Sequence, residues 1–172
     1  IQNTDAILAL EIFNRNYCEF LCTLGKPILF SDIYSTFTQG DLSADILVAD
    51  NYTASVKLYS SVIEDCKPKS IGFLGDPDYS LSFQDRFKGF LSVTQKYGFS
   101  DSYKNHSIIS NIQNFQNDIW MQNKFKTLEI PNLLVCANDI LAMKALTCLE
   151  RLNIKVPDEV MVCGYDGTPA IS

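Results

Sequence analysis

The sequence predicts a doubly wound α/β fold, in which parallel strands form a sheet covered by helices on both faces. Short apolar runs alternate with helical patterns along nearly all of the 172 residues. The runs are apolar throughout rather than alternately polar, which is typical of parallel strands buried on both faces. Right-handed crossovers then bring the carboxyl ends of the strands to one edge of the sheet.

The first part of the chain is expected to alternate strands and helices, with strands at 6–10, 27–31 and 46–49 and helices at 14–24 and 53–65. In the first of these helices, apolar side chains follow a helical spacing, and Gly25 is a typical residue for a helix to stop at. A polar loop is expected from Tyr34 to Asp45, before the third strand.

The middle of the chain is expected to contain a strand at 70–75, a helix at 81–97 and a short strand at 106–110. Asp76 and Pro77 follow the first of these strands, and Asp76 suits the first position of a β-turn. The helix ends at Gly98, another typical stop. His106, the single histidine, lies in the polar stretch SYKNHS and is expected at the solvated surface.

The last part of the chain is expected to form a helix at 114–128, a strand at 133–137, a helix at 139–152 and a strand at 160–164. Helical spacing places Phe115, Ile119, Gln122 and Phe125 on one face of the first helix. Asp139 is well placed to cap the start of the second.

Composition and charge exclude several classes of function. A net charge of −6 and a pI near 4.7 argue against direct contact between this segment and nucleic-acid phosphates. No apolar run is long enough to span a membrane, and no signal peptide is visible. Because the chain begins at Ile1 without a methionine, we expect it to be a fragment of a longer protein.

The cysteines are expected to be free thiols, as in a reducing cytosol. Cys136 and Cys163 lie within apolar runs, and Cys18 and Cys22 share one helix face, unlike the ligands of a short zinc knuckle. We therefore expect no metal and no cofactor. The sequence also lacks the glycine-rich phosphate loops and the nucleophile-elbow motif of common enzymes, so we expect no enzyme activity.

Polar side chains follow the ends of several expected strands, where ligands bind in doubly wound sheets. Asp32, Asn138 and Asp166 are the candidates of this kind. Each has an alternative structural role: Asn138 can cap the following helix, and Asp166 can form an Asx-turn before Gly167.

Arg86 lies near the start of the helix at 81–97, in a stripe with Phe90, Val93 and Tyr97 that faces the sheet. The helix dipole opposes a positive charge there, and burial without a partner would cost several kcal/mol. Arg86 therefore pairs internally, with Asp85 or a strand-end acid, or grips a ligand's hydroxyls or carboxylate.

An acid, an amide and a guanidinium at one sheet edge suit a sugar or another polyol, because each hydroxyl both donates and accepts hydrogen bonds. Tyr79 and Phe83 can cover an apolar sugar face, although core packing is the simpler role for Phe83.

Two stretches of the chain resemble the lactose/galactose-repressor family of bacterial transcription regulators. In residues 133–169, CAND precedes a helix and is followed by VPDEV and GYDGTP; residues 69–98 resemble the family's strand, turn and helix with an arginine before Gly-Phe. ILVADNYTASVKL resembles the crossover into a second lobe. Gly167 departs from the family, which usually has a second aspartate there.

The resemblance implies a periplasmic-binding-protein-like fold of two lobes, the first incomplete: residues 1–48 in the first lobe, 49–166 in the second, and 167–172 at the start of a crossover or tail. It implies effector contacts by Asp32, Ser82, Arg86, Asn138 and Asp166. Ser82 is added by the resemblance alone.

The implied function is effector sensing in a cytoplasmic repressor, with a sugar or a related small polar molecule held between the lobes. The resemblance further implies homodimers, and operator DNA bound only through an N-terminal helix-turn-helix outside this chain. Some relatives bind a phosphocarrier protein. The alternative is a periplasmic sugar-binding protein of a transporter, which shares the architecture.

Overall fold

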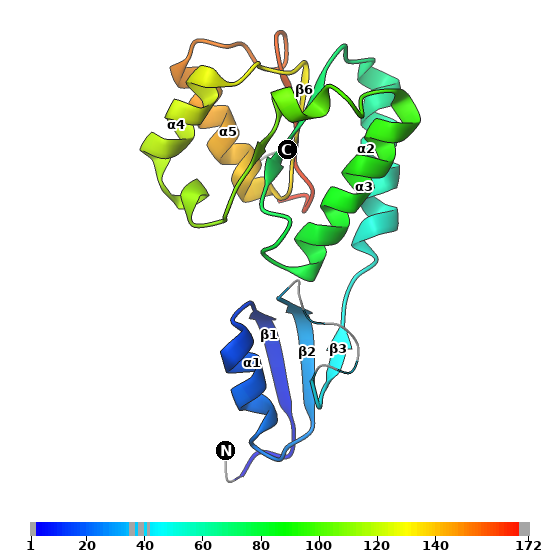
Figure 1. Cartoon of the computed structure of the whole chain (residues 1–172), viewed down its shortest axis with the longest axis vertical. Helices are drawn as coiled ribbons and strands as arrows, with labels where there is room; N and C mark the ends of the chain where they lie inside the picture. The colour runs from blue at the N-terminus through cyan, green and yellow to red at the C-terminus, as the bar shows by residue number, and fades with distance from the viewer. Residues whose placement is uncertain (1–2, 35–36, 38–39, 41, 169–172) are drawn as a thin grey trace.

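The computed structural model describes residues 3–34, 37, 40 and 42–168, which form two units, each built on its own parallel sheet (Figure 1). Residues 3–47 contain the smaller sheet, and residues 51–168 contain the larger one. The expected α/β fold with parallel sheets is confirmed. Among the described helices, none combines the length and the apolar character needed to cross a bilayer.

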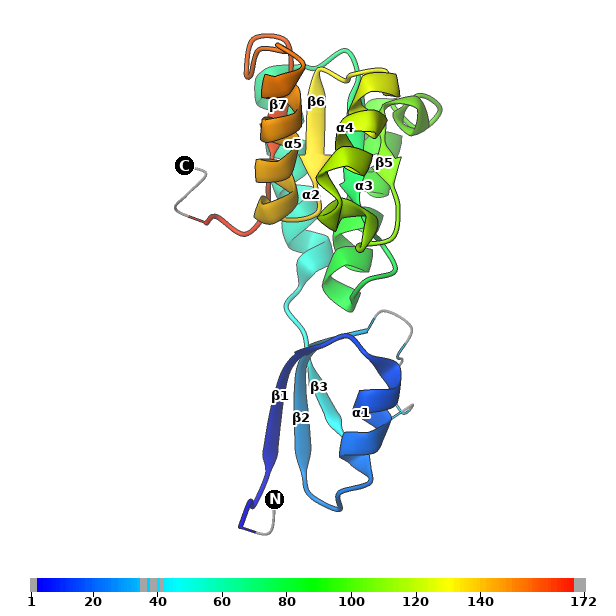
Figure 2. The ribbon, with the colours of Figure 1, turned by 90° about the vertical axis from the view of Figure 1, so that its left-hand side faces the viewer.

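The N-terminal unit consists of β1 (Ile7–Ile12), α1 (Arg15–Cys22), β2 (Ile28–Ile33) and β3 (Asp45–Leu47), with strand order β1-β2-β3. Helix α1 lies on one face of this sheet (Figure 2). Phe30, Ile33 and Cys18 are completely buried between helix and sheet, whereas Leu8 and Leu10 of β1 remain exposed.

The C-terminal unit has three layers. Its strands are β4 (Ile71–Gly75), β5 (Ile108–Ile109), β6 (Leu133–Cys136) and β7 (Met161–Cys163), in the order β5-β4-β6-β7. Its helices are α2 (Asn51–Cys66), α3 (Leu81–Tyr97), α4 (Asp118–Thr127) and α5 (Asp139–Arg151). Helices α2 and α3 cover one face of the sheet, and α4 and α5 cover the other (Figures 1 and 2). Strands β4 and β6 are fully buried between these layers, as their continuous apolar sequences predict.

Each of the five α-helices in the described residues is preceded by a polar residue whose side chain accepts a hydrogen bond from the first turn. The capping residues are Asn14, Asp50, Ser80, Asn117 and Asn138. Because short polar side chains satisfy backbone N–H groups that lack a partner in the helix, these residues fix where each helix starts.

The helix expected at 114–128 is interrupted near its start. Residues 114–116 form a 3₁₀ turn, and Asn117 caps α4, which begins at Asp118. The change of helix register leaves Ile119 71% exposed, whereas Met121 and Phe125 are buried. The expectation that Ile119 shares the buried face with Phe125 is therefore wrong.

His106 is buried rather than solvated, so the expectation of a surface histidine is wrong. It ends a 3₁₀ helix (Tyr103–His106) before the two-residue strand β5, and its ring Nδ1 lies 2.7 Å from the carbonyl oxygen of Glu129. The neighbouring strand admits this packing because Gly72 has no side chain: a Cβ there would lie 1.8 Å from the His106 carbonyl oxygen.

Candidate functional site

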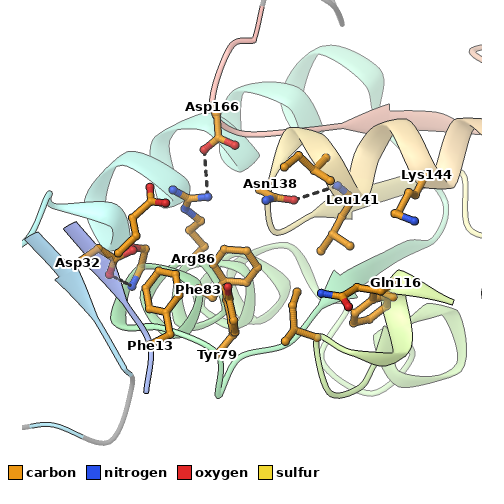
Figure 3. A pocket seen from close by; sticks show the side chains of 15 residues that line it. Phe13, Asp32, Tyr79, Phe83, Arg86, Gln116, Asn138, Leu141, Lys144 and Asp166 are labelled. Carbon is orange, nitrogen blue, oxygen red and sulfur yellow. Dashed lines mark hydrogen bonds and ion pairs between the residues drawn. The ribbon is translucent and has the colours of Figure 1, made fainter. Parts of the chain in front are cut away.

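A cavity of about 410 Å³ lies between the two units, at the carboxyl ends of β2, β6 and β7 (Figure 3). Volumes of this size are typical of small-molecule sites. The lining residues come from both units: Glu11, Phe13, Asp32, Tyr79, Ser82, Phe83, Arg86, Ile112, Phe115, Gln116, Asn138, Ile140, Leu141, Lys144 and Asp166. All seven candidate residues from the sequence analysis are among them. Their role in effector binding stays a prediction, but the structure brings them to one place.

Asp32 and Ser82 join the two units. Asp32 lies within β2, where its backbone φ of +50° turns the strand at the sheet edge. One carboxylate oxygen accepts the backbone N–H of Ser82 over 3.3 Å, and the other accepts the Ser82 hydroxyl. An acid from the smaller sheet thus sits at the positive N-terminal end of α3, a favourable place for negative charge.

Arg86 is the most constrained side chain of the site, with 11% of its side chain exposed. Its Nε donates to Asn51 Oδ1 over 3.1 Å, and its Nη1 donates to the Ala137 carbonyl oxygen over 2.7 Å. Nη1 also lies 3.2 Å from Asp166 Oδ1. Of the two alternatives, the internal pair with a strand-end acid is present, and Asp85 instead contacts Lys88. Because Arg86 also lines the cavity, the pair does not remove it from ligand contact.

The Tyr165 ring also contacts the Arg86 guanidinium. The guanidinium carbon of Arg86 lies 3.8 Å from the centre of the Tyr165 ring, within cation–π distance. Burial raises the pKa of Tyr165, whereas the adjacent Arg86 acts to lower it. Ion pair, hydrogen bonds and ring contact together fix the plane of the guanidinium fork.

Asn138 and Asp166 occupy the ends of neighbouring strands β6 and β7 and converge on the cavity (Figure 3). The Asn138 side-chain oxygen accepts the Leu141 N–H over 2.9 Å and caps α5, so the amide NH₂ group is the part that can donate to a ligand. Asp139 was expected to be this cap; it is instead the first residue of α5. The backbone N–H of Thr168, which an Asx-turn at Asp166 would use, donates to Asp139 instead. The Asp166 carboxylate contacts Arg86 and accepts the Asp139 N–H.

Aromatic rings form one wall of the cavity. The centre of the Tyr79 ring lies 4.6 Å from that of Phe13 and 5.3 Å from that of Phe83. Burial, followed by the nearby carboxylates of Glu11 and Asp32, raises the pKa of Tyr79, so its hydroxyl stays protonated and can donate a hydrogen bond at neutral pH. Such a wall suits the apolar face of a sugar ring.

Several lining residues were missed by the sequence analysis: Glu11, Phe13, Ile112, Phe115, Gln116, Ile140, Leu141 and Lys144. Glu11 directly follows the expected strand at 6–10, just as Asp32 follows the one at 27–31, so the same strand-end signal could have found it. Both adopt positive φ, at +53° and +50°, side by side on β1 and β2. The others belong to turns or helix faces whose orientation depends on the packed fold.

The site is polar at its ends and apolar in its wall, which suits binding of a small molecule with several hydroxyl groups. Carboxylates of Glu11, Asp32 and Asp166 accept hydrogen bonds, and Arg86 and Asn138 donate them. In the part of the chain that the structure describes, no cluster of three or more His, Cys, Asp or Glu side chains is arranged to hold a metal ion.

Fold and site together define a two-unit α/β domain with a small-molecule-sized cavity between its sheets. The chain belongs to the periplasmic binding protein-like domain family, whose model matches residues 67–172. The resemblance to lactose-repressor-type regulators is borne out by the relatives described next.

Two curated relatives are transcriptional regulators. The HTH-type transcriptional repressor PurR of Photobacterium profundum is 27% identical over 99 residues, which cover 57% of this chain and 29% of that protein. The HTH-type transcriptional regulator RegA of Clostridium saccharobutylicum is 31% identical over 113 residues, covering 60% of this chain and 31% of that protein. The chain thus spans about a third of the length of these relatives.

Solved structures share the fold over nearly the whole chain. A regulatory protein of the LacI family from Chloroflexus aggregans superposes with a TM-score of 0.74 at 16% identity, covering 99% of this chain and 59% of that one. A periplasmic binding protein/LacI transcriptional regulator from Alkaliphilus metalliredigens, solved with D-xylulofuranose, gives a TM-score of 0.67 at 16% identity, covering 96% of this chain and 58% of that one.

Proposed function

We propose that the chain is the effector-sensing domain of a DNA-binding transcriptional repressor, and that its effector is a sugar or a related small polar molecule. The convergence of Arg86, Asp166, Asn138 and Asp32 on one cavity between two units is the observation that carries the proposal. The two curated relatives described above support a regulator rather than the transporter-binding protein that was the alternative.

In this proposal, residues 1–48 belong to a first lobe and residues 49–166 to a second, with a crossover starting at 167–172. Residues 169–172 lie outside the described part of the chain. An effector that touches both lobes favours the arrangement in which they are close, by an amount equal to its difference in affinity for the two arrangements. Asp32 from the first lobe and Arg86, Asn138 and Asp166 from the second carry the recognition, with Ser82 between them.

In the intact protein, such a change of lobe arrangement is transmitted to a helix-turn-helix that contacts operator DNA. The proposal includes a homodimer, so that two DNA-reading heads change their spacing together. A phosphocarrier protein, which some relatives bind, is a further candidate partner that no residue of this chain selects. It places the protein in the cytoplasm and assigns it no enzymatic reaction. The acidic balance of this chain is consistent with DNA contact being made elsewhere, since phosphate binding needs a basic surface.

The aromatic wall and the balance of donors and acceptors favour a sugar over a flat apolar ligand. Three carboxylates and one amide around a cavity of about 410 Å³ can satisfy several hydroxyl groups at once. The D-xylulofuranose in the Alkaliphilus metalliredigens structure makes ketoses a sensible first probe.

Thermal-shift and calorimetric measurements of the full-length protein against D-xylulose, D-ribose, D-fructose and D-glucose test the proposal. A sugar that binds the folded state raises the melting temperature in proportion to the logarithm of its concentration. Operator binding measured with and without that sugar then links occupancy to regulation. Failure of every polyhydroxylated probe to bind would refute the sugar assignment.

A further inference from the structure

The loop that carries Asp166 is held in place from behind by the buried carboxylate of Asp139. Asp139 is 4% exposed and is not among the residues that line the cavity. Its Oδ1 accepts the backbone N–H of Tyr165 over 2.7 Å and that of Asp166 over 3.2 Å. Its Oδ2 accepts the backbone N–H of Thr168 over 2.6 Å. One carboxylate therefore organises three backbone groups of the loop.

The contact is reciprocal. The backbone N–H of Asp139, at the start of α5, donates to Asp166 Oδ2 over 3.3 Å. The other oxygen, Asp166 Oδ1, faces Arg86. Asp139 thus fixes both the backbone that bears Asp166 and one of its two carboxylate oxygens, which leaves the Asp166 side chain little freedom to choose its direction.

The local sequence is adapted to this close approach. An added Cβ at Gly164 would lie 2.1 Å from Asp139 Oδ1, so the residue before Tyr165 must lack a side chain for the carboxylate to reach the loop. Gly167 adopts a φ of +72°, which L side chains rarely adopt, and this turn brings the Thr168 N–H back towards Asp139.

We propose that Asp139 is a positioning residue for effector recognition: it acts through the 164–168 loop to orient Asp166 towards Arg86 and the cavity, without touching the effector itself. The inference rests on the proposed function for its consequence in binding, and on the described contacts alone for its effect on the loop. The hydrogen bonds from backbone N–H groups to both oxygens of a buried carboxylate are costly to break, since each donor would lose its partner.

Backbone hydrogen exchange in the full-length protein without sugar tests the effect on the loop. In Asp139→Asn and Asp139→Ala, we expect the N–H groups of Tyr165, Asp166 and Thr168 to exchange faster, while those of β4 and β6 keep their protection. The side-chain NMR signals of Arg86 should shift as well, because its partner Asp166 loses its fixed orientation. Unchanged exchange in the loop of a folded Asp139→Asn protein would overturn the proposal.

A double-mutant cycle tests the consequence for binding, with D-xylulose as the probe and D-ribose as the second. Residues that orient a binding group typically contribute a factor of about 10 to 100 in affinity, as partners of metal ligands do. We expect Asp139→Asn to weaken binding about tenfold in the natural background and little further in an Asp166→Asn background, because both changes remove the same interaction.

Leu149→Ala is the matched control, since Leu149 is completely buried in the same helix, ten residues after Asp139. It should destabilise the fold without sharing the interaction of Asp139, so its effect on binding should be the same in both backgrounds. Equal effects of Asp139→Asn in the two backgrounds would overturn the proposal. If neither probe binds the unaltered protein, the sugar assignment fails, whereas the exchange measurement still decides the role of Asp139 in the loop.

Discussion

Arg86 Nη1 lies 3.2 Å from Asp166 Oδ1, which ties helix α3 to the loop after β7 across the carboxyl edge of the larger sheet. Asn51 and the Ala137 carbonyl oxygen bind the same guanidinium. A group with this many partners keeps its orientation when a ligand enters, so its position is prepared before binding.

Arg86→Ala is expected to abolish the response to the effector and to lower the free energy of unfolding by about 1–3 kcal/mol. The figure is below that for a fully buried pair because Asp166 is 40% exposed. Chemical denaturation and calorimetry measure the two effects. Arg151→Ala, at an exposed position at the end of α5, is the control and should change neither. Retained sugar affinity in Arg86→Ala would contradict the assignment.

Ser82→Ala is expected to loosen the connection between the two units. The Ser82 hydroxyl and backbone N–H both donate hydrogen bonds to Asp32 in the smaller sheet. The substitution removes the hydrogen bond that the hydroxyl donates. Small-angle scattering of the sugar-free protein should show a larger radius of gyration. Ser92→Ala, further along the same helix, should leave the radius unchanged; identical scattering from both variants would show that the bond does not hold the units together.

Gly72→Ala is expected to destabilise the larger sheet by about 1–3 kcal/mol, because the new Cβ would meet a backbone carbonyl that cannot rotate away. Gly98→Ala is the control that measures the cost of an unfavourable backbone conformation without a steric clash. Gly98 has a φ of +81°, but an added Cβ there would meet no other atom within 4 Å. That control should cost about 1 kcal/mol from the left-handed φ alone. Urea midpoints rank the two variants, and an equal loss would mean that the sheet adjusts to the methyl group.

Asp139 is expected to make the protein sensitive to acid. Burial acts to raise its pKa, but the backbone N–H donors of Thr168, Tyr165 and Asp166 outweigh burial and hold the pKa below its ordinary value. A carboxyl whose pKa is lower in the folded state contributes stability above its unfolded pKa, near 3.9, and loses it as pH falls through the lower folded value. The contribution should therefore be complete above about pH 5.

Asp139→Asn should accordingly reduce stability at neutral pH and flatten the loss of stability below about pH 4. Urea unfolding at a series of pH values measures both. Asp158→Asn, an exposed position between α5 and β7, is the control. If the loss of stability at low pH were the same in Asp139→Asn as in the unaltered protein, this carboxylate would not contribute to acid sensitivity.

Residue types and their periodicity were sufficient to predict the order of strands and helices, because fully apolar strands and polar helix starts are local signals. Asn138 and Asp166 could be chosen as candidates for the same reason, because parallel topology brings the ends of β6 and β7 to one edge. Asp32 is also an acid at a strand end, but it belongs to the other sheet, and the packing of the two units brings it to the same cavity. Ser82 required a family resemblance, since a serine in the first turn of a helix has no local signal of function.

The packed chain decided what local patterns could not. His106 lies in a polar stretch but is buried, because the glycine on the neighbouring strand leaves room for it. Asn117 caps α4, so the helix starts at Asp118 rather than at the expected residue 114, and Ile119 is exposed. Asn138 rather than Asp139 caps α5. The partners of Arg86 and of Asp139 come from segments remote in sequence. Periodicity describes which residues share a face, whereas hydrogen-bond partners depend on how faces meet in three dimensions.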